Sequence, residues 1–156
     1  MYPILNTLHS YNRYLLLAAL AFVLFRSISG WLGQKTYEKA DNAGSAALVG
    51  LTHLQLLLGL ILYLGVSPRT QTAFANFGAA MKDPWLRYFA VEHMSVMLIA
   101  VVLIQLGRTF SKRTSDPIEK HRKLAIYTGI AALLIVVTLS MKGLLFGTMA
   151  SAVAGQ

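Results

Sequence analysis

The chain has no cysteine, and only 13% of its 156 residues are charged. The absence of cysteine excludes disulfides, cysteine-ligated iron–sulfur clusters and haem attached through thioether bonds. Soluble domains carry about 25% charged residues. The low charge, together with a 56% share of hydrophobic residues, therefore indicates an integral membrane protein. At this length we expect residues 1–156 to form a single domain.

Acidic residues are also scarce, with six Asp and Glu against 14 Lys and Arg and a net charge of +8. In a soluble protein this balance would suggest nucleic acid as a partner. Here the cations lie in short segments beside apolar runs, where anionic lipid headgroups attract them. We therefore expect a lipid bilayer as the partner and no binding of nucleic acid.

Four apolar runs, at about residues 11–32, 46–66, 85–106 and 124–146, are each long enough to cross a membrane core of about 30 Å. Only helices satisfy their own backbone groups in lipid without closing a barrel. Pro3, Asp83-Pro84 and Asp116-Pro117 are typical of helix starts, and Gly30 and Gly33 of a helix end. The sequence predicts an all-α membrane protein, an antiparallel four-helix transmembrane bundle, with a short surface helix in residues 67–84.

The basic residues predict the orientation of this bundle. The first and third connections and their flanks hold the larger share: Lys35, Lys39, Arg108, Lys112, Arg113, Lys120, Arg122 and Lys123. Because such residues accumulate on the cytoplasmic side, we expect a multi-pass protein with both termini outside.

One histidine lies near or within each apolar run: His9, His53, His93 and His121. An ionisable side chain inside a membrane span indicates a functional site, and paired histidines are the usual ligands of non-covalent haem in a helical bundle. The first and third helices are diagonal in an up-down bundle, as are the second and fourth. The preferred arrangement is therefore two haems, an outer one on His9 and His93 and an inner one on His53 and His121.

Depth leaves a competing arrangement open. At about 1.5 Å per residue, each diagonal pair is offset by about 10 Å, whereas His53 and His93 lie closer in depth. A single central haem on His53 and His93 is the second possibility. The third is no haem, with histidines that bond between helices or lie at the membrane surface.

Two arginines are candidates for holding haem propionates. Arg13 is four residues after His9 and shares its helix face, and Arg26 lies in the inner half of the first helix. Arginines near span ends also reach out to headgroups, which is the alternative interpretation. Glu92, beside His93, is expected to pair with Arg13 or to accept a proton.

Several short motifs resemble those of small four-span bacterial membrane proteins labelled cytochrome b-like. They are Leu8-His9-Ser10-Tyr11-Asn12-Arg13, Thr52-His53 through Leu60, Met81-Lys82-Asp83-Pro84, Phe89 through His93, and His121-Arg122-Lys123. The four-histidine layout is also similar to the core of the cytochrome b561 family, which holds two haems through diagonal histidine pairs. The resemblance implies a bacterial inner-membrane cytochrome with one or two haem b groups. It would exchange electrons with a quinone or a redox partner protein, within or across the membrane.

Two other functions remain open from the residues. The small mass outside the spans also fits an accessory or anchor subunit of a larger respiratory complex, in which the histidines are structural. A transporter or channel could instead use His53, His93 and Glu92 as a path for protons or metal ions, although few acidic residues lie inside the spans.

Overall fold

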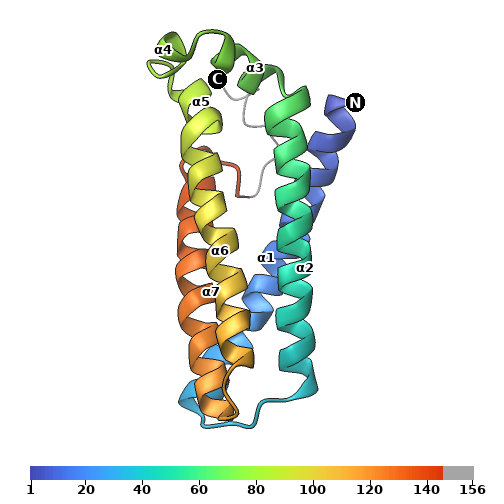
Figure 1. The fold of residues 1–156 in the computed structure, drawn as a ribbon, viewed down its shortest axis with the longest axis vertical. Coiled ribbons are helices and arrows are strands. Elements are labelled where there is room, and N and C mark those ends of the chain that lie inside the picture. The colour runs from blue at the N-terminus through green and yellow to red at the C-terminus, as the bar shows by residue number, and fades with distance from the viewer. Residues whose placement is uncertain (146–156) are drawn as a thin grey trace.

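The computed structural model describes residues 1–145, which form an all-helical bundle (Figure 1). The first span is α1 (Tyr2–Leu32), and the second is α2 (Lys39–Ile61) continued by the π-helix η1 (Leu62–Val66). The third combines α5 (Pro84–Arg87), the π-helix η2 (Tyr88–Glu92) and α6 (His93–Lys112), and the fourth is α7 (Pro117–Ser140). All four are long and apolar enough to cross a membrane, which confirms the predicted bundle.

The four spans form a closed ring. α1 packs against α2 and α7, and α6 also packs against α2 and α7. Therefore α1 and α6 lie on one diagonal and α2 and α7 on the other, as expected. Residues 33–38 and 113–116 connect the spans at one end, here called the hairpin end. The other end, the α3 end, carries α3 (Pro68–Ala75), α4 (Phe77–Ala80) and the N-terminus (Figure 1).

The predicted helix starts are present. The Asp83 carboxylate accepts hydrogen bonds from the backbone N–H groups of Trp85 and Leu86, and that of Asp116 accepts one from Ile118. These bonds satisfy donors that a helix start leaves unpaired, and the following proline needs no such bond. The short helix expected between residues 67 and 84 is present as two, α3 and α4.

Two helix ends differ from the apolar runs. α1 starts at Tyr2, with Pro3 in its first turn as predicted, nine residues before the apolar run that begins near residue 11, so His9 lies inside the helix. α7 stops at Ser140, before the expected end at Phe146, a residue outside the described part of the chain. The stop is a Schellman motif: Leu144 N–H donates to Leu139 O, Gly143 N–H donates to Ser140 O, and Gly143 has a φ of 63°. Glycine adopts this left-handed conformation without steric cost.

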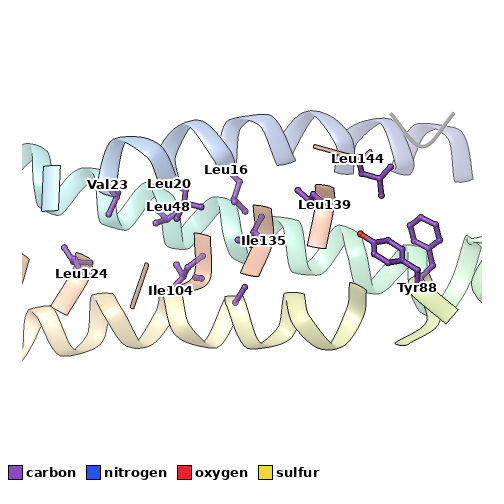
Figure 2. Packing of buried hydrophobic residues seen from close by; sticks show 13 residues of the cluster. Leu16, Leu20, Val23, Leu48, Tyr88, Ile104, Leu124, Ile135, Leu139 and Leu144 are labelled. Atoms are coloured by element: carbon purple, nitrogen blue, oxygen red, sulfur yellow. The ribbon is translucent and has the colours of Figure 1, made fainter. Parts of the chain in front are cut away.

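Buried apolar side chains from all four spans meet along the bundle axis (Figure 2). They include Leu16, Leu20, Leu48, Ile104, Leu124, Ile135 and Leu139. Large apolar side chains are also exposed on the opposite faces, among them Phe25, Leu57, Ile99 and Leu133. A bundle that is apolar inside and outside is compatible with a multi-pass membrane protein whose outer faces contact lipid.

Candidate functional site

A cavity of about 130 Å³ lies between the spans towards the α3 end. Its polar lining includes His9 and Arg13 of α1, Gln55 of α2 and His93 of α6. Apolar side chains of α6 and α7 form much of the remaining wall. The structure therefore brings together two of the four histidines, and they are the predicted outer pair on the α1–α6 diagonal.

His9 is held by a network of amides between α1 and α2. The Gln55 side-chain nitrogen lies 3.0 Å from the His9 carbonyl oxygen and 3.1 Å from His9 Nε2. The Asn12 amide nitrogen donates to Gln55 Oε1 at 2.7 Å and to the Leu51 carbonyl at 3.0 Å. His9 Nδ1 is buried without a hydrogen-bond partner among the described residues. The imidazole of His9 thus has a fixed position at the cavity wall.

His93 starts α6 immediately after the π-helix η2. Single π-turns inside α-helices occur frequently at functional sites. The His93 ring lies 5.7 Å from the ring of Tyr88 and 6.3 Å from that of Phe89, measured between centroids. Its Nδ1 is also buried and makes no hydrogen bond within residues 1–145. Both cavity histidines therefore have a buried ring nitrogen with unused bonding capacity, which is costly in an apolar interior.

At the α3 end of the cavity, one hydrogen bond joins the two π-helices and another joins η1 to α3. The Tyr63 hydroxyl of η1 donates to the Ala90 carbonyl of η2 at 2.7 Å. The Thr70 hydroxyl of α3 donates to the Tyr63 carbonyl at 2.9 Å, and Ser67 and Thr70 both line the cavity. These contacts place α3 over the cavity and hold the two irregular segments together.

Arg13 is buried, with 8% of its surface exposed, and lies at the same cavity as His9. Its guanidinium carbon lies 4.9 Å from the centre of the Tyr14 ring. The expected pair between Glu92 and Arg13 is not formed. Glu92, the last residue of η2, binds Arg87, the last residue of α5, at 2.7 Å, and both side chains are partly exposed. A proton-accepting role of Glu92 remains a prediction.

His121 lies at the hairpin end, where it is 2% exposed. Its Nε2 is 3.2 Å from the Thr36 carbonyl oxygen, and its ring centroid is 5.1 Å from that of Tyr37. A Cβ placed on Gly30 would come within 2.5 Å of the ring, so glycine makes room for it. His121 therefore fills a close contact between α7, α1 and the 33–38 connection.

Arg26 lies beside this contact. Its guanidinium binds Asp41 at 2.7 Å and Glu38 at 2.8 Å. Glu38 and Asp41 form the capping box at the start of α2. The structure thus places the guanidinium of Arg26 in contact with two carboxylates at the hairpin end, away from the cavity.

His53 is exposed on α2 and does not line the cavity. It lies 12 residues after Asp41, which is about 18 Å along a helix. Asp41 and His121 both border the packed contact at the hairpin end. The structure therefore brings His53 together neither with His121, its partner in the two-haem arrangement, nor with His93, its partner in the central single-haem arrangement.

Sequence reasoning missed Asn12 and Gln55. The available signal was a polar amide inside an apolar run, which lipid disfavours unless it has a partner. Asn12 lies between His9 and Arg13, but the contact of Gln55 with His9 joins residues 46 positions apart and depends on how α1 and α2 pack. Within residues 1–145 no group of three or more His, Cys, Asp or Glu side chains is placed to hold a metal ion.

Comparison with family models, with curated proteins and with solved structures found no match for the chain. The resemblance to cytochrome b-like proteins therefore stays a prediction from the motifs.

Proposed function

We propose that this protein is a membrane electron-transfer cytochrome that binds haem b between His9 and His93. The observation that carries the proposal is the placement of these two histidines, on diagonal spans, at one cavity. Both keep a buried ring nitrogen without a partner among the described residues. Two neutral imidazoles are a suitable ligand set for a low-spin b-type haem, and no cysteine is present to attach one covalently.

The other residues of the cavity support the same ligand. Buried Arg13 offers a cation for a propionate, and the apolar wall from α6 and α7 suits the porphyrin faces. When bound, haem b supplies a one-electron ferric/ferrous couple. The chain's own contribution is to orient the ligands, to hold the propionate charge and to exclude water, which together set the reduction potential.

The size of the cavity sets a condition on this proposal. Sites for drug-sized ligands enclose about 300–1,000 Å³. The cavity here is about 130 Å³, which is too small for a porphyrin. It reaches the seam between α2 and α6, the least extensively packed of the four neighbouring pairs. Haem binding therefore requires these two helices to move apart at the α3 end.

The proposal contains one haem rather than two. The predicted inner pair is separated, since His53 is exposed and His121 is packed at the hairpin end. We further propose a bacterial inner membrane as the location, with the basic hairpin end on the cytoplasmic side. The haem would then lie in the outer half of the membrane, where the α3 end faces a quinone or a redox partner protein.

Absorption spectroscopy tests the cofactor. The full chain is purified in detergent from haem-replete cells, and dithionite-reduced and oxidised spectra are compared, with a pyridine haemochrome assay for stoichiometry. We expect sharp low-spin bands on reduction, one haem per chain, and complete extraction into acid–acetone. A colourless protein that also fails to bind added haemin would overturn the proposal and favour the accessory-subunit interpretation.

Reporter fusions test the orientation. A fusion at the N-terminus should report the outer side, and an insertion in the 113–116 connection should report the cytoplasm. The opposite pattern would contradict the proposed location of the haem in the outer half without affecting the cofactor itself.

A further inference from the structure

At the hairpin end, one contact fixes how α2 and α6 lie against each other. Arg108 Nη1 of α6 donates to the Asn42 carbonyl oxygen of α2 at 3.0 Å, and also to the Ser45 hydroxyl. Because α2 starts and α6 ends at the hairpin end, residues before Asn42 and residues after Arg108 both lie closer to that end. The contact therefore marks the seam between the two helices there.

Two lysines border this seam one helical turn closer to the end. Lys39 precedes Asn42 by three residues on α2. Lys112 follows Arg108 by four residues on α6. Residues three or four positions apart share a helix face, so both lysines lie on the faces that make the contact. Both are exposed, and neither forms an ion pair within residues 1–145. Two positive charges thus flank one seam.

The carboxylates of the chain are committed to other partners. Like charges on two sides of a seam repel each other, and an anion between them would remove this repulsion. The sequence has six acidic residues, and all of them lie in the described part of the chain. Their partners there are known for each: Arg26 for Glu38 and Asp41, Arg122 for Glu119, Arg87 for Glu92, and helix-start amides for Asp83 and Asp116. The anion that suits Lys39 and Lys112 must therefore come from outside the chain.

Towards the middle of the spans the same two helix faces are apolar. On α2, Ala46 and Val49 follow Asn42 by four and seven residues. On α6, Val101 precedes Arg108 by seven residues. Of the four neighbouring pairs of spans, α2 and α6 are the least extensively packed against each other. Since Ala46 is exposed and small, the outer side of the seam is open to an acyl chain.

We propose that this seam binds one anionic phospholipid, with the phosphate between Lys39 and Lys112 and an acyl chain along the apolar part. Phosphate oxygens accept strong hydrogen bonds from ammonium groups, and basic pockets between transmembrane helices suit anionic headgroups. The charged end and its apolar continuation match the two parts of a phospholipid, whereas a free anion would match only the lysines. The bound lipid links α2 to α6 where they contact each other least. The site lies at the hairpin end, away from the cavity, so it does not depend on haem binding.

Lipid titration of the purified full chain tests the proposal. The chain is kept in an uncharged detergent, and phosphatidylglycerol, phosphatidylcholine or inorganic phosphate is added at the same concentration. Native mass spectrometry counts bound lipid, and thermal unfolding measures stability. We expect one tightly bound phosphatidylglycerol per chain and a rise in melting temperature that shrinks with added salt, since salt screens exposed charges. An equal effect of phosphatidylcholine or of inorganic phosphate would overturn the assignment of an anionic phospholipid.

Substitution of the two lysines tests the position of the headgroup. Lys39→Gln and Lys112→Gln should each weaken phosphatidylglycerol binding about fivefold, and the double variant should weaken it further. Lys82→Gln, at an exposed lysine of the α3 end, is the matched control. Lys35→Gln, in the 33–38 connection, is a second control that removes the same charge from the hairpin end. An equal loss in Lys35→Gln would show that lipid responds to the general charge of this end, and would refute the seam site.

Charge reversal separates the loss of the lipid site from damage to the fold. In Lys112→Glu the new carboxylate can pair with Lys39 across the seam. The variant should therefore keep at least the lipid-free melting temperature of wild type, but lose the rise that phosphatidylglycerol causes. Wild-type phosphatidylglycerol binding by Lys112→Glu would show that the phosphate does not lie at Lys112, and would overturn the proposal.

Discussion

The two ends of the bundle each contain a buried histidine contact, but they are built differently. At the hairpin end, the ring of His121 meets a backbone carbonyl, an aromatic ring and a glycine, and fills the space between them. At the α3 end, His9 and His93 border a cavity, and two π-helices interrupt the regular spans. The same residue type is thus a packing element at one end and a candidate ligand at the other. What separates the two roles is the space and the partners around the ring.

The charged residues follow the same division. At the hairpin end, Arg26 binds the capping carboxylates of α2, and Arg108 of α6 donates to the Asn42 carbonyl and the Ser45 hydroxyl. These contacts join the start of α2 to both of its neighbours. At the α3 end, buried Arg13 lies at the cavity. The hairpin end is thus joined by charged contacts between helices, whereas the α3 end contains the cavity.

The largest expected effect comes from removing a cavity histidine. His9→Ala and His93→Ala should each abolish haem binding, because the proposed site would lose one of the two iron ligands that the protein supplies. His53→Ala is the control and should retain the wild-type haem content, since His53 is exposed on α2. Pyridine haemochrome assays of the purified variants measure the outcome. If His53→Ala lost haem while His9→Ala retained it, the haem ligand would be His53, and the assignment of the ligand role to His9 would be wrong.

At the hairpin end the expected effect is on stability. Gly30→Ala places a Cβ within 2.5 Å of the His121 ring, which is backed by Tyr37 and cannot retreat freely. Overpacking of this kind costs about 1–3 kcal/mol, and haem content should remain unchanged once the protein is folded. Thermal unfolding in detergent measures the loss. Gly50→Ala is the matched control, because a Cβ there meets nothing within 4 Å. Equal melting temperatures of the two variants would show that His121 is loosely held.

A smaller effect is expected where the two π-helices are joined. Tyr63→Phe removes the hydroxyl that donates to the Ala90 carbonyl and leaves the ring in place. The loss of one hydrogen bond costs about 0.5–1.5 kcal/mol. Hydrogen exchange of the amides in η2 should accelerate, while those near His121 keep wild-type protection. Tyr11→Phe, at an exposed tyrosine of α1, serves as the control. If hydrogen exchange accelerated equally in η2 and near His121, the two ends of the bundle would not be independent regions.

Much of the fold could be predicted from local signals. Apolar runs of membrane-crossing length and the two Asp-Pro pairs marked the spans and two of their starts, because hydropathy and helix capping act over a few residues. The end of α7 was missed because the apolar run continues past it, while Gly143 stops the helix through its left-handed backbone. The diagonal of an up-down bundle predicted that His9 and His93 lie near one another, and both residues line one cavity. Their role as a ligand pair stays a prediction.

The sequence by itself determined that the chain is a four-span helical bundle, since each span is specified by its own composition and caps. It also placed one histidine near each span. Only the tertiary structure decided which histidines face a cavity, because that depends on the rotation and the length of each helix relative to its neighbours. Each span carries apolar residues on every side, so lipid alone would accept several rotations of the helix about its own axis. Contacts between distant residues, such as Asn12 with Gln55 and His121 with Gly30, select one of them.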